Sequence, residues 1–111
     1  MSGFIYIASP YSHLSGIVRY NRFIAVCRVA ARLMEEGHVV FSPIAHSHPI
    51  CEVLRPQTNP LLFWMRQDLP ILALAEKLVV LMLPGWDISK GVKMEMDFAN
   101  EKGIPVEYMQ P

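Results

Sequence analysis

The chain has 111 residues, which is the size of one domain. Hydrophobic residues make up 52% of it, enough to build a core at this length. Ten basic residues balance ten acidic ones, and this zero formal net charge argues against a protein that binds nucleic acid by neutralising its phosphates. An apolar chain without net charge favours a homo-oligomer, a dimer or tetramer that hides part of its surface.

Nothing in the sequence indicates export or membrane insertion. No apolar stretch is long enough to span a bilayer. The first residues, Met1 to Phe4, lack the basic and apolar regions of a signal peptide. Two cysteines, Cys27 and Cys51, do not resemble a disulfide framework. We therefore expect a cytoplasmic protein that does not associate with membranes.

The first half of the chain alternates short apolar runs with a long helical pattern. Residues 4–8 form an apolar run that predicts a buried strand. In residues 17–36 apolar side chains recur at helical spacing with arginines between them, and Gly37 is expected to end this helix. Residues 38–41 predict a second strand. The prolines of segment 44–60 predict an irregular loop.

The second half continues the alternation. Residues 61–75 predict a helix capped by Asn59, which Pro70 is expected to break or kink. Three more segments complete the pattern as an apolar strand, a long helix and a last strand suited to a sheet edge: residues 77–83, 89–102 and 104–108.

This alternation of strands and helices predicts a parallel sheet with right-handed crossovers and helices on both faces. We expect a single domain over residues 1–111, an α/β three-layer sandwich of the small flavodoxin-like or Rossmann-like kind, with about four strands in the order 2-1-3-4. Ligands of such folds bind beyond the carboxyl ends of the strands, where the strand order reverses. From this rule we expect Ser9, Pro10 and Tyr11 to lie near Trp86 and near the helix that starts at Ser89.

Glu95 is the leading candidate for chemistry. Gly91 lies one turn before it and Ala99 one turn after it, so two small residues share its helix face and leave room for a ligand. The backbone N–H groups and dipole of the helix start are expected to favour its charged form. An ionised carboxylate in a cleft is a usable nucleophile. A solvated glutamate on a helix surface is the alternative.

Three further polar residues each admit two interpretations. Ser89 is an N-cap, and with the N–H of Gly91 it also suits an anion. Tyr6 is either a core residue or a partner of the acid. Asp68 is either a helix cap or a ligand for sugar hydroxyls.

The histidines of the middle segment raise the question of a metal. His46, His48 and Cys51 offer suitable ligands, but no further cluster completes a zinc set, so we predict neither a metal nor another cofactor. His46 or His48 is expected to bind substrate instead. We expect Trp64 in the core and Trp86 at the rim of the pocket.

Three motifs occur in order along the chain: the run from Ile5 to Tyr11, Asp68 in the middle, and Ser-x-Gly-x-x-x-Glu from Ser89 to Glu95, followed by Ala99 and Gly103-Ile104-Pro105-Val106. Together they resemble the nucleoside 2-deoxyribosyltransferase superfamily over nearly the whole chain. The segments 45–49 and 63–69 are similar, more narrowly, to an uncharacterised bacterial branch of that superfamily.

The resemblance implies cleavage of an N-glycosidic bond through a covalent intermediate. Glu95 would attack the anomeric carbon of a nucleoside or nucleotide, and a second base or water would then take up the sugar. Tyr6 would hold the glutamate in place, and Asp68 would lie near the sugar and base. The catalytic set implied is therefore Glu95, Tyr6 and Asp68.

Ser89 points to the substrate within this resemblance. Transferases that act on free nucleosides tend to carry Asp at its position, whereas the 5′-monophosphate N-hydrolases carry Ser and direct it towards the phosphate. An aspartate would repel that phosphate, and a serine donates to it. We therefore expect a nucleotide N-hydrolase; the alternative is a non-catalytic nucleotide-binding or sensing module. The expected substrate-binding residues are Ser9, Pro10, Tyr11, His46, His48, Trp86, Ser89 and Gly91.

Overall fold

The computed structural model describes residues 3–111. Four strands form one parallel sheet in the order β2-β1-β3-β4. Their bounds are Ile5–Ala8 for β1, Val40–Phe41 for β2, Lys77–Leu81 for β3 and Val106–Met109 for β4. The predicted α/β class and the predicted 2-1-3-4 order are confirmed. The order reverses between β1 and β3, so a crevice is expected beyond their carboxyl ends.

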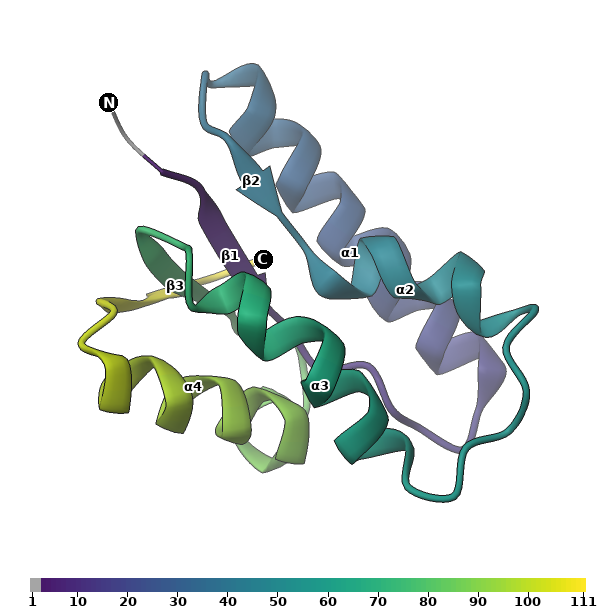
Figure 1. The fold of residues 1–111 in the computed structure, drawn as a ribbon. Helices are drawn as coiled ribbons and strands as arrows, with labels where there is room; N and C mark the ends of the chain where they lie inside the picture. Colours follow the sequence, from purple (N-terminus) through teal and green to yellow (C-terminus); the bar gives the residue numbers. More distant parts are fainter. Residues whose placement is uncertain (1–2) are drawn as a thin grey trace.

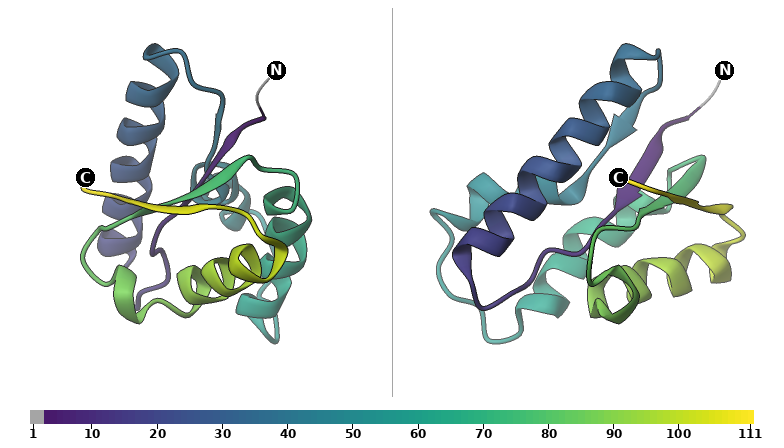
Figure 2. Two further views of the ribbon diagram at one scale, coloured as in Figure 1. Left: turned by 90° about the vertical axis from the view of Figure 1, so that its left-hand side faces the viewer. Right: turned by 180° about the vertical axis from the view of Figure 1, so that it is seen from behind.

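Four helices cover the sheet: α1 (Gly16–Glu35), α2 (Pro43–Cys51), α3 (Pro60–Leu72) and α4 (Lys90–Lys102). The strands pass between α1 on one side and α3 with α4 on the other (Figures 1 and 2), which is the expected three-layer arrangement. A short 3₁₀ turn, η1 (Trp86–Ile88), precedes α4. Within residues 3–111, every helix is too short or too polar to cross a bilayer.

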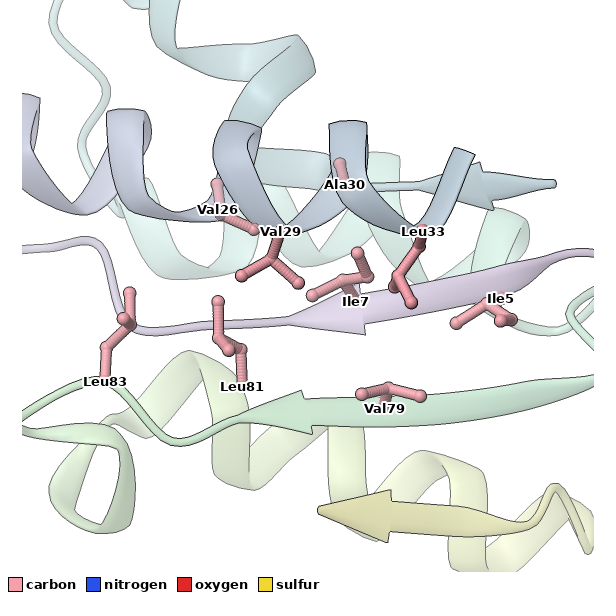
Figure 3. Close-up of a cluster of buried hydrophobic side chains, with 9 residues drawn as sticks. All are labelled: Ile5, Ile7, Val26, Val29, Ala30, Leu33, Val79, Leu81 and Leu83. Carbon is pink, nitrogen blue, oxygen red and sulfur yellow. The ribbon is translucent and has the colours of Figure 1, made fainter. Parts of the chain in front are cut away.

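The two faces of the sheet follow the alternation of side chains along each strand. Ile5 and Ile7 of β1 join Val79 and Leu81 of β3 in a cluster under α1 (Figure 3). The intervening residues point to the other face, where Tyr6 packs in a second cluster with residues of α3 and α4. Tyr6 is therefore directed to the face covered by the helix that carries Glu95.

The predicted loop over residues 44–60 is partly wrong, because α2 occupies its first half. Ser42 caps this helix by accepting a hydrogen bond from the N–H of Ala45 at 3.1 Å, and Pro43 occupies the first helical position, where its missing N–H costs nothing. Pro49 lies near the end of the helix and removes a single backbone donor there. The prolines of segment 44–60 indicated a loop, but Pro49 lies within α2 and Pro60 starts α3, so Pro56 alone of the three lies in the irregular part.

Of the predicted break or kink at Pro70, the break is wrong, since α3 continues to Leu72, and the kink stays a prediction. Pro70 sits in the last turn of the helix with its ring exposed to solvent. Asn59 caps the start of α3 as predicted and accepts from the N–H of Leu62 at 3.1 Å. The continuous helix places Asp68 on its buried side, two turns after its start, instead of at a bend.

Leu72 provides a test of the core on the face that holds Tyr6. Its side chain is fully buried, whereas Leu74, two residues later, is 76% exposed. We expect Leu72→Ala to lower the free energy of unfolding by about 2–5 kcal/mol, because it leaves a cavity in the core. The matched control Leu74→Ala should change it by less than about 0.5 kcal/mol. Urea unfolding followed by circular dichroism measures both, and equal losses would contradict this packing.

Candidate active site

A cavity of about 590 Å³ opens beyond the carboxyl ends of β1 and β3. It lies at the switch point that the strand order predicts. The predicted site residues that line it come from the loop after β1, from α3 and from the start of α4: Ser9, Pro10, Tyr11, Asp68, Ser89, Gly91 and Glu95. Its size falls within the range of small-molecule sites in proteins.

Glu95 and Tyr6 form a hydrogen bond between the sheet and α4. The hydroxyl of Tyr6 donates to Oε2 of Glu95, across 89 positions of sequence. Tyr6 is fully buried beneath the cavity, and Glu95 is only 3% exposed while lining it. The sequence-based interpretation of Tyr6 as a partner of the acid therefore agrees with the geometry.

The expectation that the helix start keeps Glu95 charged is wrong. The unpaired N–H groups and the dipole act within the first turn of a helix. Glu95 is the sixth residue of α4 and lies beyond that turn. The pKa of Glu95 is raised to about 8, mainly by burial; the Tyr6 hydroxyl opposes this shift, and the neighbouring charge of Asp68 adds to it. In the free protein the carboxyl is therefore mainly protonated at neutral pH.

Asp68 is the second buried acid of the cavity. It is 6% exposed, and burial raises its pKa to about 6. At neutral pH it is consequently the more ionised of the two acids. The Tyr6 hydroxyl has a strongly raised pKa, first because of burial and then because of the charges of Glu95 and Asp68, so it stays a hydrogen-bond donor at any physiological pH.

Ser9, a residue of the cavity wall, carries an unpaired polar atom. Its side chain is 5% exposed, and its Oγ is buried without a hydrogen-bond partner among residues 3–111. Buried hydroxyls are ordinarily paired, so an orphaned one in a cavity wall indicates a ligand or water as the partner.

Ser89 is the N-cap of α4, as predicted. Its Oγ accepts from the N–H of Val92 at 3.2 Å, so that donor is already used within the helix. Gly91 lines the cavity, and its N–H has no partner within the helix because it lies in the first turn. Ala99, expected beside the ligand, lies instead in the hydrophobic core and takes no part in the cavity wall.

The predicted positions of the two tryptophans are wrong: Trp64 lines the cavity, and Trp86 packs against the core. Trp86 does not line the cavity, and its ring packs against the second core cluster and lies 5.7 Å from the Tyr108 ring. The left-handed backbone of Gly85 (φ +94°) and the 3₁₀ turn that follows carry the Trp86 side chain to that position. Trp64, expected in the core, lies in the cavity wall on α3.

The histidines of α2 also lie outside this cavity. His46 is exposed and packs near the ring of Phe41. His48 shares a 2.6 Å hydrogen bond with the Tyr11 hydroxyl and stacks on Phe23, with ring centroids 4.1 Å apart. Because these residues form a helix and not a loop, His48 is directed towards α1 and His46 towards Phe41 of β2. In the part of the chain described, no three potential ligands converge on a metal position.

Sequence reasoning missed two arginines of the cavity wall, Arg19 and Arg22 at the start of α1. Both fall between the apolar positions of the helix, and this pattern does not distinguish a side chain that faces solvent from one that faces a cavity. The topology of the fold carries the missing signal. The start of a helix that follows a parallel strand lies at the carboxyl edge of the sheet, where ligands bind.

The fold and this cavity define a class of protein, the nucleoside deoxyribosyltransferase-like α/β domain. The chain is similar in structure to the 2-deoxyribosyltransferase of the psychrotolerant bacterium Bacillus psychrosaccharolyticus, with a TM-score of 0.69 and 25% sequence identity over 96% of this chain and 72% of that one. No curated protein sequence matches the chain significantly.

Within this class the chain belongs to a family defined by sequence alone. Residues 3–111 match the family model described as "Domain of unknown function (DUF1937)". The family assignment therefore carries no reaction with it, and the chemistry must be argued from the site.

The buried carboxyl of Glu95 predicts a pH-dependent stability. Below the ordinary pKa of 4.5 the group is neutral in both states, so burial costs little. Between pH 4.5 and about 8 the unfolded chain releases the proton while the folded protein retains it, so the stability present at low pH is progressively lost. Above pH 8 the loss is complete.

Glu95→Gln removes this ionisation and keeps an acceptor for Tyr6. We expect the variant to gain on the order of 3–5 kcal/mol relative to the native chain between pH 4.5 and pH 8.5. Chemical denaturation at both pH values measures the gain. Glu101→Gln, exposed on the same helix, is the matched control for loss of a carboxylate. An unchanged difference between the two pH values would refute the burial of an ionisable acid at position 95.

Proposed function

We propose that this protein cleaves the N-glycosidic bond of a nucleoside or nucleotide, with Glu95 as the nucleophile. The observation that carries the proposal is the Tyr6–Glu95 hydrogen bond at the wall of a cavity of nucleoside size. The similarity to a 2-deoxyribosyltransferase supports the same class of reaction. A second acid, Asp68, in the same cavity supports a reaction whose transition state carries positive charge.

The proposed reaction has two steps. A carboxylate oxygen of Glu95 bonds to the anomeric carbon as the bond to the base nitrogen breaks; the bonding electron pair leaves with the base, which takes a proton from solvent. Water then bonds to the anomeric carbon, the ester to Glu95 breaks, and its electron pair returns to the carboxylate. The proton released by that water passes to solvent. A second base in place of water would make the protein a transferase.

The neighbouring groups suit the charge that develops. The Tyr6 hydroxyl orients one oxygen of Glu95 and leaves the other for the sugar. Asp68, with its lower pKa, is the acid that is ionised at neutral pH, and its negative charge stabilises an oxocarbenium-like centre. The same positive centre favours ionisation of Glu95 when the substrate is in place, which opposes the effect of burial.

We favour a nucleoside 5′-monophosphate as the substrate and water as the acceptor. Ser89 at the start of α4 supports this, because a hydroxyl and the first-turn N–H groups attract a phosphate that an aspartate there would repel. A nucleotide-binding module without turnover is the second candidate. The protonated resting state of Glu95 favours it, since a neutral acid binds a ligand without attacking it.

A panel of nucleosides and 5′-monophosphates tests the reaction. We expect released base to be detected by chromatography, and Glu95→Ala to reduce kcat by at least about a thousandfold, because it removes the group that forms the covalent bond. Glu101→Ala on the exposed face of α4 should retain full activity. Binding of nucleotides without any release of base would instead establish the second candidate.

The pKa of Glu95 predicts the pH dependence of the reaction. Only the carboxylate attacks, so kcat/KM should rise about tenfold per pH unit below pH 8 and level off above it. Initial rates from pH 5.5 to 9.5, with protein stability checked at each pH, measure the profile. A rate that is constant from pH 6 to pH 9 would show that the attacking group is not this buried acid.

A further inference from the structure

Two arginines in the cavity wall have no part in the chemistry at Glu95. Arg19 and Arg22 lie three residues apart near the start of α1, on the same side of the helix, and both line the cavity. The ion pairs among residues 3–111 are Lys77–Glu107 and Lys93–Asp97, so neither arginine is neutralised by a carboxylate in the described chain. Together with Lys90 at the start of α4, the two arginines outnumber the acids of the cavity wall, Asp68 and Glu95, so the wall carries an excess of basic groups.

Arg22 is held by the two loops that meet at the switch point. Its guanidinium donates to the carbonyl oxygens of Tyr11 at 3.4 Å and Ser12 at 3.0 Å, in the loop after β1, and of Pro84 at 3.2 Å, in the loop after β3. Carbonyl partners orient the planar group but leave its charge in place. These three bonds position the guanidinium before any ligand arrives, which lowers the entropy cost of binding one.

Gly85 makes room for that guanidinium. A Cβ at this position would lie 2.8 Å from Nη2 of Arg22, and the backbone φ of +94° also favours glycine. Any other residue would displace the end of the Arg22 side chain. The neighbouring Arg19 is held less extensively, by one bond to the carbonyl of His13.

The remaining polar groups of the cavity indicate which ligand the arginines bind. Ser89 and Lys90 line the same space, and their hydroxyl and ammonium groups can donate to an anion with several oxygens. Asp68, the ionised acid at neutral pH, would repel an anion beside it, so the side of α1 is the favourable place for a bound anion. A molecule with a neutral sugar and a terminal phosphoryl group matches this arrangement, with the sugar near the acids and the phosphoryl group near the arginines.

We infer that Arg19 and Arg22 bind the terminal phosphoryl group of a phosphomonoester, with Arg22 as the pre-positioned contact. The sugar placement rests on the proposed function, but the anion site does not require turnover. In this proposal the specificity for a phosphate group comes from Arg19 and Arg22 of α1. Ser89 is an additional donor to the phosphate and does not determine the specificity alone.

Binding of small ligands without a base tests this directly. The probes are 2-deoxyribose 5-phosphate, 2-deoxyribose and inorganic phosphate, measured by titration calorimetry on the native chain and on Arg19→Gln, Arg22→Gln and Arg28→Gln. We expect each of the first two variants to weaken binding of the sugar phosphate about ten- to hundredfold, since each removes a charged hydrogen-bond donor. Arg28, exposed on the same helix and absent from the cavity wall, is the matched control and should leave binding unchanged.

The outcomes separate this inference from the proposed reaction. Equal affinity of the native chain for sugar and sugar phosphate overturns the inference, as does inorganic phosphate binding as tightly as the sugar phosphate. Arg22→Gln also removes the hydrogen bonds that connect two loops, so the melting temperature of this variant must be measured. If the variant is unfolded, the binding data of Arg19→Gln alone test the inference.

Tight binding of the sugar phosphate with no base release would refute the glycosidase and support the anion site. Base release from nucleosides and monophosphates at equal kcat/KM would do the reverse.

Discussion

The hydrogen bond from Tyr6 to Glu95 is the constraint on which the rest of the site depends. Each partner is buried, and a buried hydroxyl or carboxyl without a partner costs several kcal/mol, so each requires the other. The bond therefore fixes how α4 is rotated against the sheet. It also requires Tyr6 to face α4, which the alternation of Ile5, Tyr6 and Ile7 along β1 ensures. A one-residue slip of β1 would destroy the core and the site together.

Burial sets the protonation of Glu95, and the helix dipole does not offset it. The dipole contributes about 0.3–1 kcal/mol and only within the first turn, whereas a shift of the pKa from 4.5 to about 8 corresponds to several kcal/mol. Burial therefore dominates. The result is an acid that is costly to ionise in the empty cavity and cheaper to ionise next to a positive centre. The burial of Glu95 therefore lowers the free energy of unfolding at neutral pH, and the proposed function would explain why this cost is tolerated.

The sequence predicted the architecture well because strand and helix periodicities are local, and the crossover rule converts them into a strand order. It failed where proline was treated as a breaker without regard to position: Pro49 lies within α2, and Pro70 lies in the last turn of α3. In the site, Glu95 was singled out by the small residues one turn before and after it and by the motif from Ser89 to Glu95. Arg22 was missed because periodicity shows which residues avoid the core, and cannot show which of them face a cavity assembled from distant loops.

The layers of the fold determine how a ligand can lie in the cavity. Helix α1 covers one face of the sheet and α4 covers the other, yet Arg22 and Glu95 line the same space. A ligand that contacts both must therefore pass across the carboxyl edge of the sheet, between the ends of β1 and β3. Arg22 bridges the loops after these two strands, so it closes one side of that passage. Such a passage orients an asymmetric ligand in one direction only, with its anionic group towards α1 and the opposite end towards Tyr6 and Glu95. Under the proposed function, with a phosphorylated nucleoside as the ligand, that direction would bring the glycosidic bond to the acid, and the anion site and the reacting acid would both follow from the same topology.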